Sequence, residues 1–187
     1  SLETRGWLLD VMNCVESLGK RDADGLAVGP TPLVALGATD QHAQVQLFME
    51  GPADKTITFL RVAKPESDLI IPALEPTIPE LAYLGGHSLG ELLAVEQEAT
   101  AAALAAMGRP SMTLTIDRVD AWHLGGLLAL FAIATVYAGT LYHVDPLTQP
   151  GVELGKRLTY HTMGHPQYHG VAEERAGFPV ADPSKSL

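Results

Sequence analysis

The segment that most constrains the fold is residues 121–143, which contains no Asp, Glu, Lys or Arg and is largely apolar. Its length is close to the roughly 20 residues that a helix needs to cross a bilayer. Glycines, a histidine and tyrosines interrupt it, and its flanks show no clear Lys/Arg bias on one side. A fully buried helix of an α/β core has the same hydropathy. We therefore expect a buried helix and no membrane partner.

The composition indicates a globular chain. Its 187 residues are 47% hydrophobic and 18% charged, which suffices for a real core and suits one domain. The net charge of -10 argues against nucleic acid and anionic membranes as partners, although a local pocket can still bind a phosphorylated sugar. Cys14 is the single cysteine, so no disulfide framework is expected and a cytoplasmic location fits.

Periodicity predicts alternating helices and strands. Apolar residues at helical spacing predict helices over 7–18, 40–50 and 88–107. Short β-branched or alternating runs predict strands over 33–36, 56–62 and 112–116. Residues 22–32 are expected to form a turn-rich connector, and 64–86 a long irregular connection. Strands separated by helices predict an α/β fold with parallel pairing.

A polar cluster follows the apolar segment. Pro150 suits the first turn of a helix, because its fixed φ and missing N–H cost nothing there. Glu153 and Lys156 then lie three residues apart on one helix face, and Gln149 lies at the helix start. On spacing alone this cluster is either a surface helix with an ion pair or part of a polar ligand site.

Three ordered runs resemble the glucose-6-phosphate isomerase (phosphoglucose isomerase) family. Residues 139–156 resemble its C-terminal signature, except that Leu147 stands where the family usually has an aromatic residue. Residues 16–20, Glu-Ser-Leu-Gly-Lys, resemble the segment that supplies the family's carboxylate base. Residues 37–42 resemble the segment that supplies its ring-opening histidine. The signature positions filled here are Gly139, Leu141, Tyr142, Thr148, Gln149, Gly151, Val152, Glu153 and Lys156.

The resemblance implies an aldose–ketose isomerase that interconverts glucose 6-phosphate and fructose 6-phosphate through an enediolate. It implies that Glu16 moves the proton between C1 and C2. His42 would open the sugar ring, with Lys156 holding the ring oxygen, and Gln149 would contact the substrate. No metal or organic cofactor is implied.

The resemblance also implies architecture. Family members have a three-layer sugar-isomerase (SIS-like) fold with a mainly parallel sheet flanked by helices. Residues 1–163 would be the C-terminal domain of such an enzyme, and residues 164–187 a surface or flexible tail. Family members are homodimers whose histidine reaches the neighbouring subunit's site. Because the likeness covers only the family's C-terminal part, we expect little turnover without an N-terminal half, which a separate chain can supply.

Two other functions remain open. One is a non-catalytic phosphosugar-binding or dimerisation domain. The other is an acyltransferase or hydrolase using Ser88, because residues 86–90 match the G-x-S-x-G nucleophile elbow, with His143 and Asp117 or Asp120 as candidate partners. A capping box between Ser88 and Glu91 explains the same residues more simply.

Three histidines near the end of the chain have a spacing that suits metal ligands. His161, His165 and His169 lie four residues apart, as ligands on one helix face would. Gly164 and Pro166 interrupt a helix there, so we expect solvated tail histidines and no metal. His87 and His123 have no predicted partner.

Overall fold

The computed structural model describes residues 14–73 and 78–171. These residues form two compact units. The first unit is built from the described residues between Leu33 and Phe131, and the second from those before residue 33 and after residue 131. Most of the predicted helix over 7–18 lies outside the described residues, which show its end as one helical turn at 14–16.

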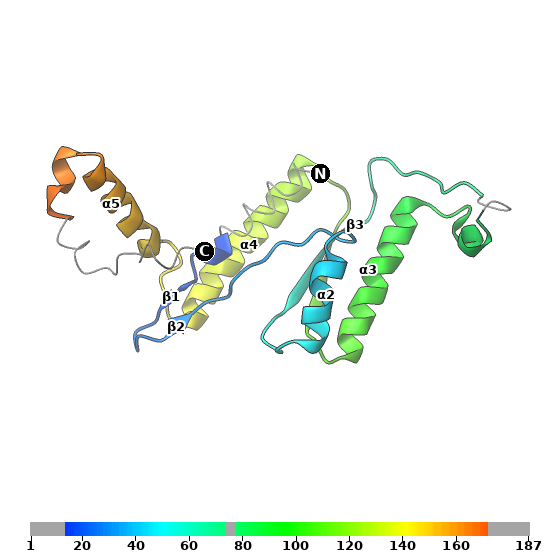
Figure 1. Ribbon diagram of the computed structural model, residues 1–187, viewed down its shortest axis with the longest axis horizontal. Coiled ribbons are helices and arrows are strands. Elements are labelled where there is room, and N and C mark those ends of the chain that lie inside the picture. Colours follow the sequence, from blue (N-terminus) through cyan, green and yellow to red (C-terminus); the bar gives the residue numbers. More distant parts are fainter. Residues whose placement is uncertain (1–13, 74–77, 172–187) are drawn as a thin grey trace, which may run out of the picture. The chain divides into compact units, whose positions relative to one another are not determined.

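A two-stranded parallel sheet organises the first unit. Strands β3 (Ile57–Val62) and β4 (Ser111–Ile116) pair in parallel, with Ile57 opposite Ser111. Helix α3 (Leu89–Ala106) lies between them in the sequence, as a parallel crossover requires. The predicted strands at 56–62 and 112–116 and their parallel pairing are confirmed (Figure 1).

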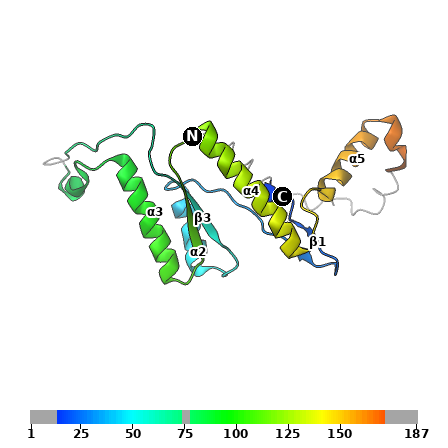
Figure 2. The ribbon, with the colours of Figure 1, turned by 180° about the vertical axis from the view of Figure 1, so that it is seen from behind.

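Helix α2 (Gln41–Glu50) lies on one side of this sheet, in front of it in Figure 1 and behind it in Figure 2. Arg109, two residues before β4, donates hydrogen bonds of 2.7 and 3.0 Å to the carbonyl oxygen of Met49 and one of 2.8 Å to that of Gly51. These carbonyls at the helix end would otherwise lack partners. The predicted helix over 40–50 is confirmed, with Asp40 at its N-cap position.

The predicted strand over 33–36 is wrong. No strand forms there among the described residues. The backbone N–H of Leu36 instead donates to the Asp40 carboxylate at 2.7 Å, so it serves the turn that precedes α2 and no sheet ladder. An apolar run of four residues does not distinguish these two arrangements.

Helix α3 follows a long connection that contains the 3₁₀ helix η1 (Pro79–Leu84). Ser88 is its N-cap, and the Ser88 hydroxyl accepts the Glu91 backbone N–H at 3.0 Å. The carboxylate of Glu91 pairs with Nδ1 of His87 at 2.9 Å. The Ser88 half of the predicted capping box is therefore confirmed, whereas the Glu91 carboxylate contacts the His87 side chain. Gly108, at φ +66°, follows the helix in the left-handed conformation that glycine adopts readily.

Helix α4 (Ala121–Tyr142) is the predicted apolar helix, but it is not the expected buried one. Trp122 is 84% exposed and Leu141 80% exposed. By length and composition alone, α4 could cross a membrane, with a mean hydropathy of 1.9; it is the one such helix among the described residues. Helices this apolar are normally covered on every side, so the expectation of a buried helix is wrong for the described residues.

The second unit begins with a hairpin that the sequence did not reveal. Strand β1 (Lys20–Arg21), just before the connector predicted over 22–32, pairs antiparallel with β2 (Ala27–Val28) inside it. The Asp22 carboxylate accepts the backbone N–H groups of Asp24 and Leu26, at 3.0 and 2.9 Å. Asp at the first position of a turn commonly makes such bonds.

The rest of the second unit follows α4. The 3₁₀ helix η2 (Pro150–Val152) leads into α5 (Glu153–Thr162), and the 3₁₀ helix η3 (Pro166–Val171) follows. The helix predicted to start at Pro150 is thus confirmed.

The expected core is small in the described residues. The buried hydrophobic side chains there are Leu18, Leu104 and Leu127. Many large apolar side chains are exposed instead, including Leu33, Met112 and Ile133. Parallel sheets are normally covered on both faces, so the described units display surfaces of a kind that is usually internal.

Candidate functional site

The Gln149–Lys156 segment is built as its sequence predicts. Pro150 is the first residue of η2, and Glu153 begins α5. Oε1 of Glu153 and Nζ of Lys156 lie 2.7 Å apart, which confirms the predicted ion pair. The hydrogen bond from Lys156 to the Glu153 carboxylate raises the pKa of Lys156 above its ordinary value of 10.5. Lys156 is therefore positively charged at neutral pH and keeps its proton there.

Gln149 is the residue before η2, with non-helical backbone at φ −133° and ψ 68°. Its side chain makes no cap to the helix and is exposed. An amide that is exposed and does not serve the helix is available to a polar ligand, as the sequence pattern suggested.

Glu16 lies in the same unit, at the end of the helical turn 14–16. Its backbone carbonyl accepts the N–H of Gly19 at 3.0 Å, and the residue is exposed. Nζ of Lys20 donates to the carbonyl oxygens of Ser17, at 2.6 Å, and of Asp145. Lys20 thereby ties the chain just after Glu16 to the connection that leads into Gln149.

The sequence had assigned no such role to Lys20. The only signal for it is its position in the Glu-Ser-Leu-Gly-Lys run. Its contact with Asp145 spans 125 residues, and local patterns carry no information on contacts of that separation.

His42 lies in the first unit, in the first turn of α2, and is exposed. Its neighbour Gln41 donates to the Thr100 hydroxyl at 3.3 Å, which links α2 to α3. The four predicted site residues are thus divided between the units: Glu16, Gln149 and Lys156 belong to the second unit and His42 to the first.

Ser88 lacks the setting of a nucleophile elbow. A buried strand should precede such a serine directly, whereas here η1 and the residues that follow it do so. Its backbone is ordinary, at φ −92° and ψ 158°. The hydrogen bond with Ser88, and next the Gly90 N–H, lower the pKa of Asp68. The Ser88 hydroxyl therefore caps the start of α3.

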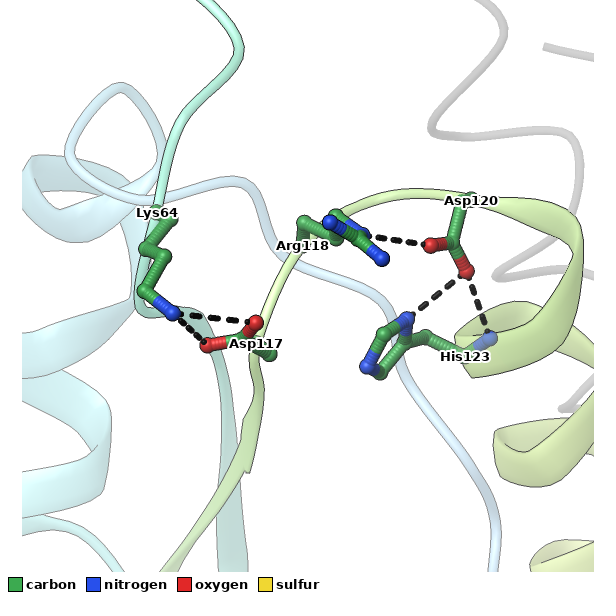
Figure 3. Close-up of polar contacts among 5 residues, drawn as sticks. All are labelled: Lys64, Asp117, Arg118, Asp120 and His123. Atoms are coloured by element: carbon green, nitrogen blue, oxygen red, sulfur yellow. Dashed lines mark hydrogen bonds and ion pairs between the residues drawn. The ribbon is translucent and has the colours of Figure 1, made fainter.

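The two acids considered as partners of Ser88 form their own network at the ends of β3 and β4 (Figure 3). Asp117 pairs with Nζ of Lys64 at 2.9 Å, and Asp120 pairs with Arg118 at 2.8 Å and with Nδ1 of His123 at 2.7 Å. The backbone N–H of His123 is the largest of the contacts that lower the pKa of Asp120. Asp120 thus holds the start of α4.

His87 and His123, for which the sequence predicted no partner, each pair with a carboxylate. His87 pairs with Glu91 and His123 with Asp120, spacings of four and three residues that the helix period would have indicated. In the tail, Nδ1 of His161 lies 3.0 Å from the carbonyl oxygen of Tyr168. No group of three or more metal-binding side chains occurs among the described residues.

Comparison with known proteins finds similarity to one family. Residues 85–175 match the family model of phosphoglucose isomerase. A glucose-6-phosphate isomerase of Rubrobacter xylanophilus is 48% identical over 153 residues, which are 82% of this chain and 34% of that protein. A probable glucose-6-phosphate isomerase of Halobacterium salinarum is 52% identical over 141 residues, 75% of this chain and 31% of that protein.

Solved structures agree. A hypothetical protein from Thermus thermophilus superposes with a TM-score of 0.76 at 41% identity, over 82% of this chain and 37% of that one. A glucose-6-phosphate isomerase from Chlamydia trachomatis gives 0.67 at 19% identity, over 89% of this chain and 34% of that one, and so shares the fold. These matches confirm the predicted resemblance: the chain is a relative of the phosphoglucose isomerases and spans about a third of the length of the curated relatives it matches.

Proposed function

We propose that this chain supplies part of the active site of a glucose-6-phosphate isomerase, which interconverts glucose 6-phosphate and fructose 6-phosphate. The observation that carries the proposal is that the segment 85–175, which matches the family model, contains Gln149 just before η2 and Lys156 in α5. Phosphate is bound by local donors, so the acidic net charge of -10 is no obstacle.

The proposed chemistry assigns one task to each residue. The Glu16 carboxylate takes the proton from C2 of the open-chain aldose and returns it to C1 of the enediolate, while the hydroxyl proton on O2 passes to O1. His42 passes a proton between the ring oxygen and the hydroxyl during ring opening, a task suited to an imidazole. Lys156 keeps its charge beside the sugar oxygen, and Gln149 hydrogen-bonds the substrate.

The four side chains of the proposed site are exposed to solvent, which supports an active site that further polypeptide must cover. Glu16, His42, Gln149 and Lys156 are all exposed, whereas carboxylates that take carbon-bound protons gain basicity when partly removed from water. We propose that the complete enzyme has the three-layer sugar-isomerase fold, works in the cytoplasm as a homodimer, and closes this site with polypeptide that the chain does not span.

The test is a coupled assay of fructose 6-phosphate conversion. The chain is assayed alone and after co-expression with the part of the Rubrobacter xylanophilus relative that lies outside the 153 matched residues. We expect little turnover alone and clear turnover in combination. Glu16→Gln should lower kcat by at least about 10³-fold, since the reaction has no other base.

Glu80→Gln is the matched control, because Glu80 is an exposed carboxylate in η1, outside the proposed site. It should leave the turnover unchanged. A combination that turns over equally well with Glu16→Gln would remove Glu16 from the mechanism.

A non-catalytic phosphosugar-binding domain is the second candidate, favoured by the same exposure of the four side chains. It predicts saturable binding of fructose 6-phosphate by the chain, undiminished by Glu16→Gln, with no turnover in the combined sample. Isothermal titration calorimetry on both variants distinguishes it from the isomerase.

A further inference from the structure

Two segments of the second unit carry residues of the proposed site. One segment carries Glu16, and the other ends at Gln149. The side chain of Lys20 contacts both, because its Nζ donates to the carbonyl oxygen of Ser17 at 2.6 Å and also to that of Asp145. One partly buried ammonium group therefore joins two segments that are far apart in the sequence.

The segment around Glu16 is held on both sides of this residue. Ser17 is 8% exposed and Leu18 3% exposed. The Ser17 hydroxyl donates to the carbonyl oxygen of Cys14 at 2.9 Å, and the Glu16 carbonyl accepts the N–H of Gly19 at 3.0 Å. The backbone that carries the exposed Glu16 side chain is therefore anchored.

The turn around Asp145 is ordered by its own contacts. The Asp145 carboxylate accepts the backbone N–H of Leu147 at 2.9 Å and the hydroxyl of Thr148 at 3.2 Å. A Cβ atom added to Gly139, in α4, would lie 2.8 Å from the ring of Pro146, so this turn packs closely on the end of the helix. Because each segment is ordered within itself, a contact between the two fixes their relative position.

We propose that Lys20 is a positioning residue of the isomerase site, which sets the Glu16 carboxylate and the Gln149 amide at the distance that one bound sugar phosphate requires. Lys20 acts through the two backbone carbonyls that it holds and does not touch the substrate. An ammonium suits this task, since it offers three donors and its hydrogen bonds are charge-assisted. This inference rests on the proposed function, because the reaction it serves is the isomerisation assigned to Glu16.

The first test is amide hydrogen exchange, measured by NMR on the full chain. Lys20→Met removes the ammonium and keeps a long aliphatic side chain. Exchange at Leu147, whose N–H is bonded within the Asp145 turn, should become at least about tenfold faster, because the turn loses a hydrogen bond from a charged donor. Lys20→Arg keeps the charge and the donors and should stay close to the parent chain.

The second test measures the proton transfer. The variants are assayed in combination with the part of the Rubrobacter xylanophilus relative that lies outside the matched residues, on glucose 6-phosphate that carries deuterium at C2. Lys20→Met should lower kcat by about 10- to 100-fold, as misplaced reacting groups do. It should also raise the deuterium isotope effect, because proton transfer becomes the slow step. The isotope effect is a ratio of rates, so a loss of folded protein does not change it, and Lys20→Arg should restore both values.

Lys55→Met is the matched control. Lys55 is also a partly buried lysine that donates to a backbone carbonyl, that of Pro52 at 3.4 Å, but it lies in the first unit and outside the proposed site. Its replacement should change neither the exchange at Leu147 nor the isotope effect.

The outcomes separate this inference from the proposed function. A parent chain that gives no turnover in combination refutes the proposed function, and the positioning role falls with it. With an active parent combination, the positioning role alone is overturned if Lys20→Met keeps the parent isotope effect or the parent exchange at Leu147. It is also overturned if exchange rises throughout the second unit, since that result means a general loss of folding.

Discussion

Lys156 and Glu153 show how a residue spacing becomes an electrostatic property. They lie three positions apart in the sequence, and one helical turn places their charged groups 2.7 Å apart. Asp120 receives the backbone N–H of His123 in the same local way. Such contacts depend on helix geometry alone, which is why the spacing of Glu153 and Lys156 predicted theirs.

The first prediction concerns the pKa of Lys156. Because the Glu153 carboxylate raises it above 10.5, the pair favours the folded state at neutral pH, and this contribution is lost as the pH rises through the raised pKa. Glu153→Gln should lower the pKa of Lys156 toward its ordinary value. An NMR titration of the Lys156 side chain measures this, and an unchanged pKa would exclude Glu153 as the cause.

A second prediction follows from Asp120. Its pKa is lowered from 3.8, chiefly by the backbone N–H of His123 and the Arg118 side chain. Its stabilisation of the start of α4 is therefore present above pH 3.8 and is lost as the pH falls through the lowered pKa. Asp120→Asn should remove this acid dependence, read from the ¹³C shifts of residues 121–124, while Asp24→Asn in the β1–β2 turn should retain it.

At the scale of elements, caps and turns explain where the helices begin and end. Ser88 starts α3 by accepting the Glu91 N–H, and His143, at φ 55°, follows the last residue of α4 in the left-handed conformation. The strand predictions were less successful than the helix predictions. The alternation at 56–62 formed β3, whereas 33–36 formed none, because a strand needs a partner that the local sequence does not specify.

The third prediction tests the Ser88 cap. Ser88→Ala should destabilise the first unit by about 1 kcal/mol, the usual cost of losing a serine N-cap, measured by urea denaturation. Ser88→Asn keeps an accepting oxygen and should be close to the parent chain. Labelling of Ser88 by a fluorophosphonate probe would contradict the capping role and revive the nucleophile.

At the scale of the whole molecule, the predicted site is divided. Glu16 belongs to the second unit and His42 to the first, and the described residues bury few apolar side chains. A homodimer in which His42 serves the neighbouring subunit's site would complete such a site from two chains, as the family resemblance implies.

The fourth prediction tests that sharing. Glu16→Gln and His42→Ala chains, each inactive in the combined enzyme, are co-expressed with the complementing polypeptide. If His42 acts in the neighbouring site, random pairing makes half the dimers hybrid with one intact site each, so about a quarter of the parent activity should return. If His42 acts beside its own Glu16, the mixture should stay inactive.

The sequence by itself determined the local structure and the resemblance of this protein. Periodicity placed α2, α3 and the parallel strands, and the uncharged apolar run placed α4, since each depends on side chains a few residues apart. The order of three short runs pointed to the isomerase family, which the comparisons confirm. Only the tertiary structure decided which predicted strand found a partner, that Lys20 reaches Asp145, and that α4 is exposed. Those outcomes depend on contacts between residues far apart in the sequence, whose free energy no local pattern contains.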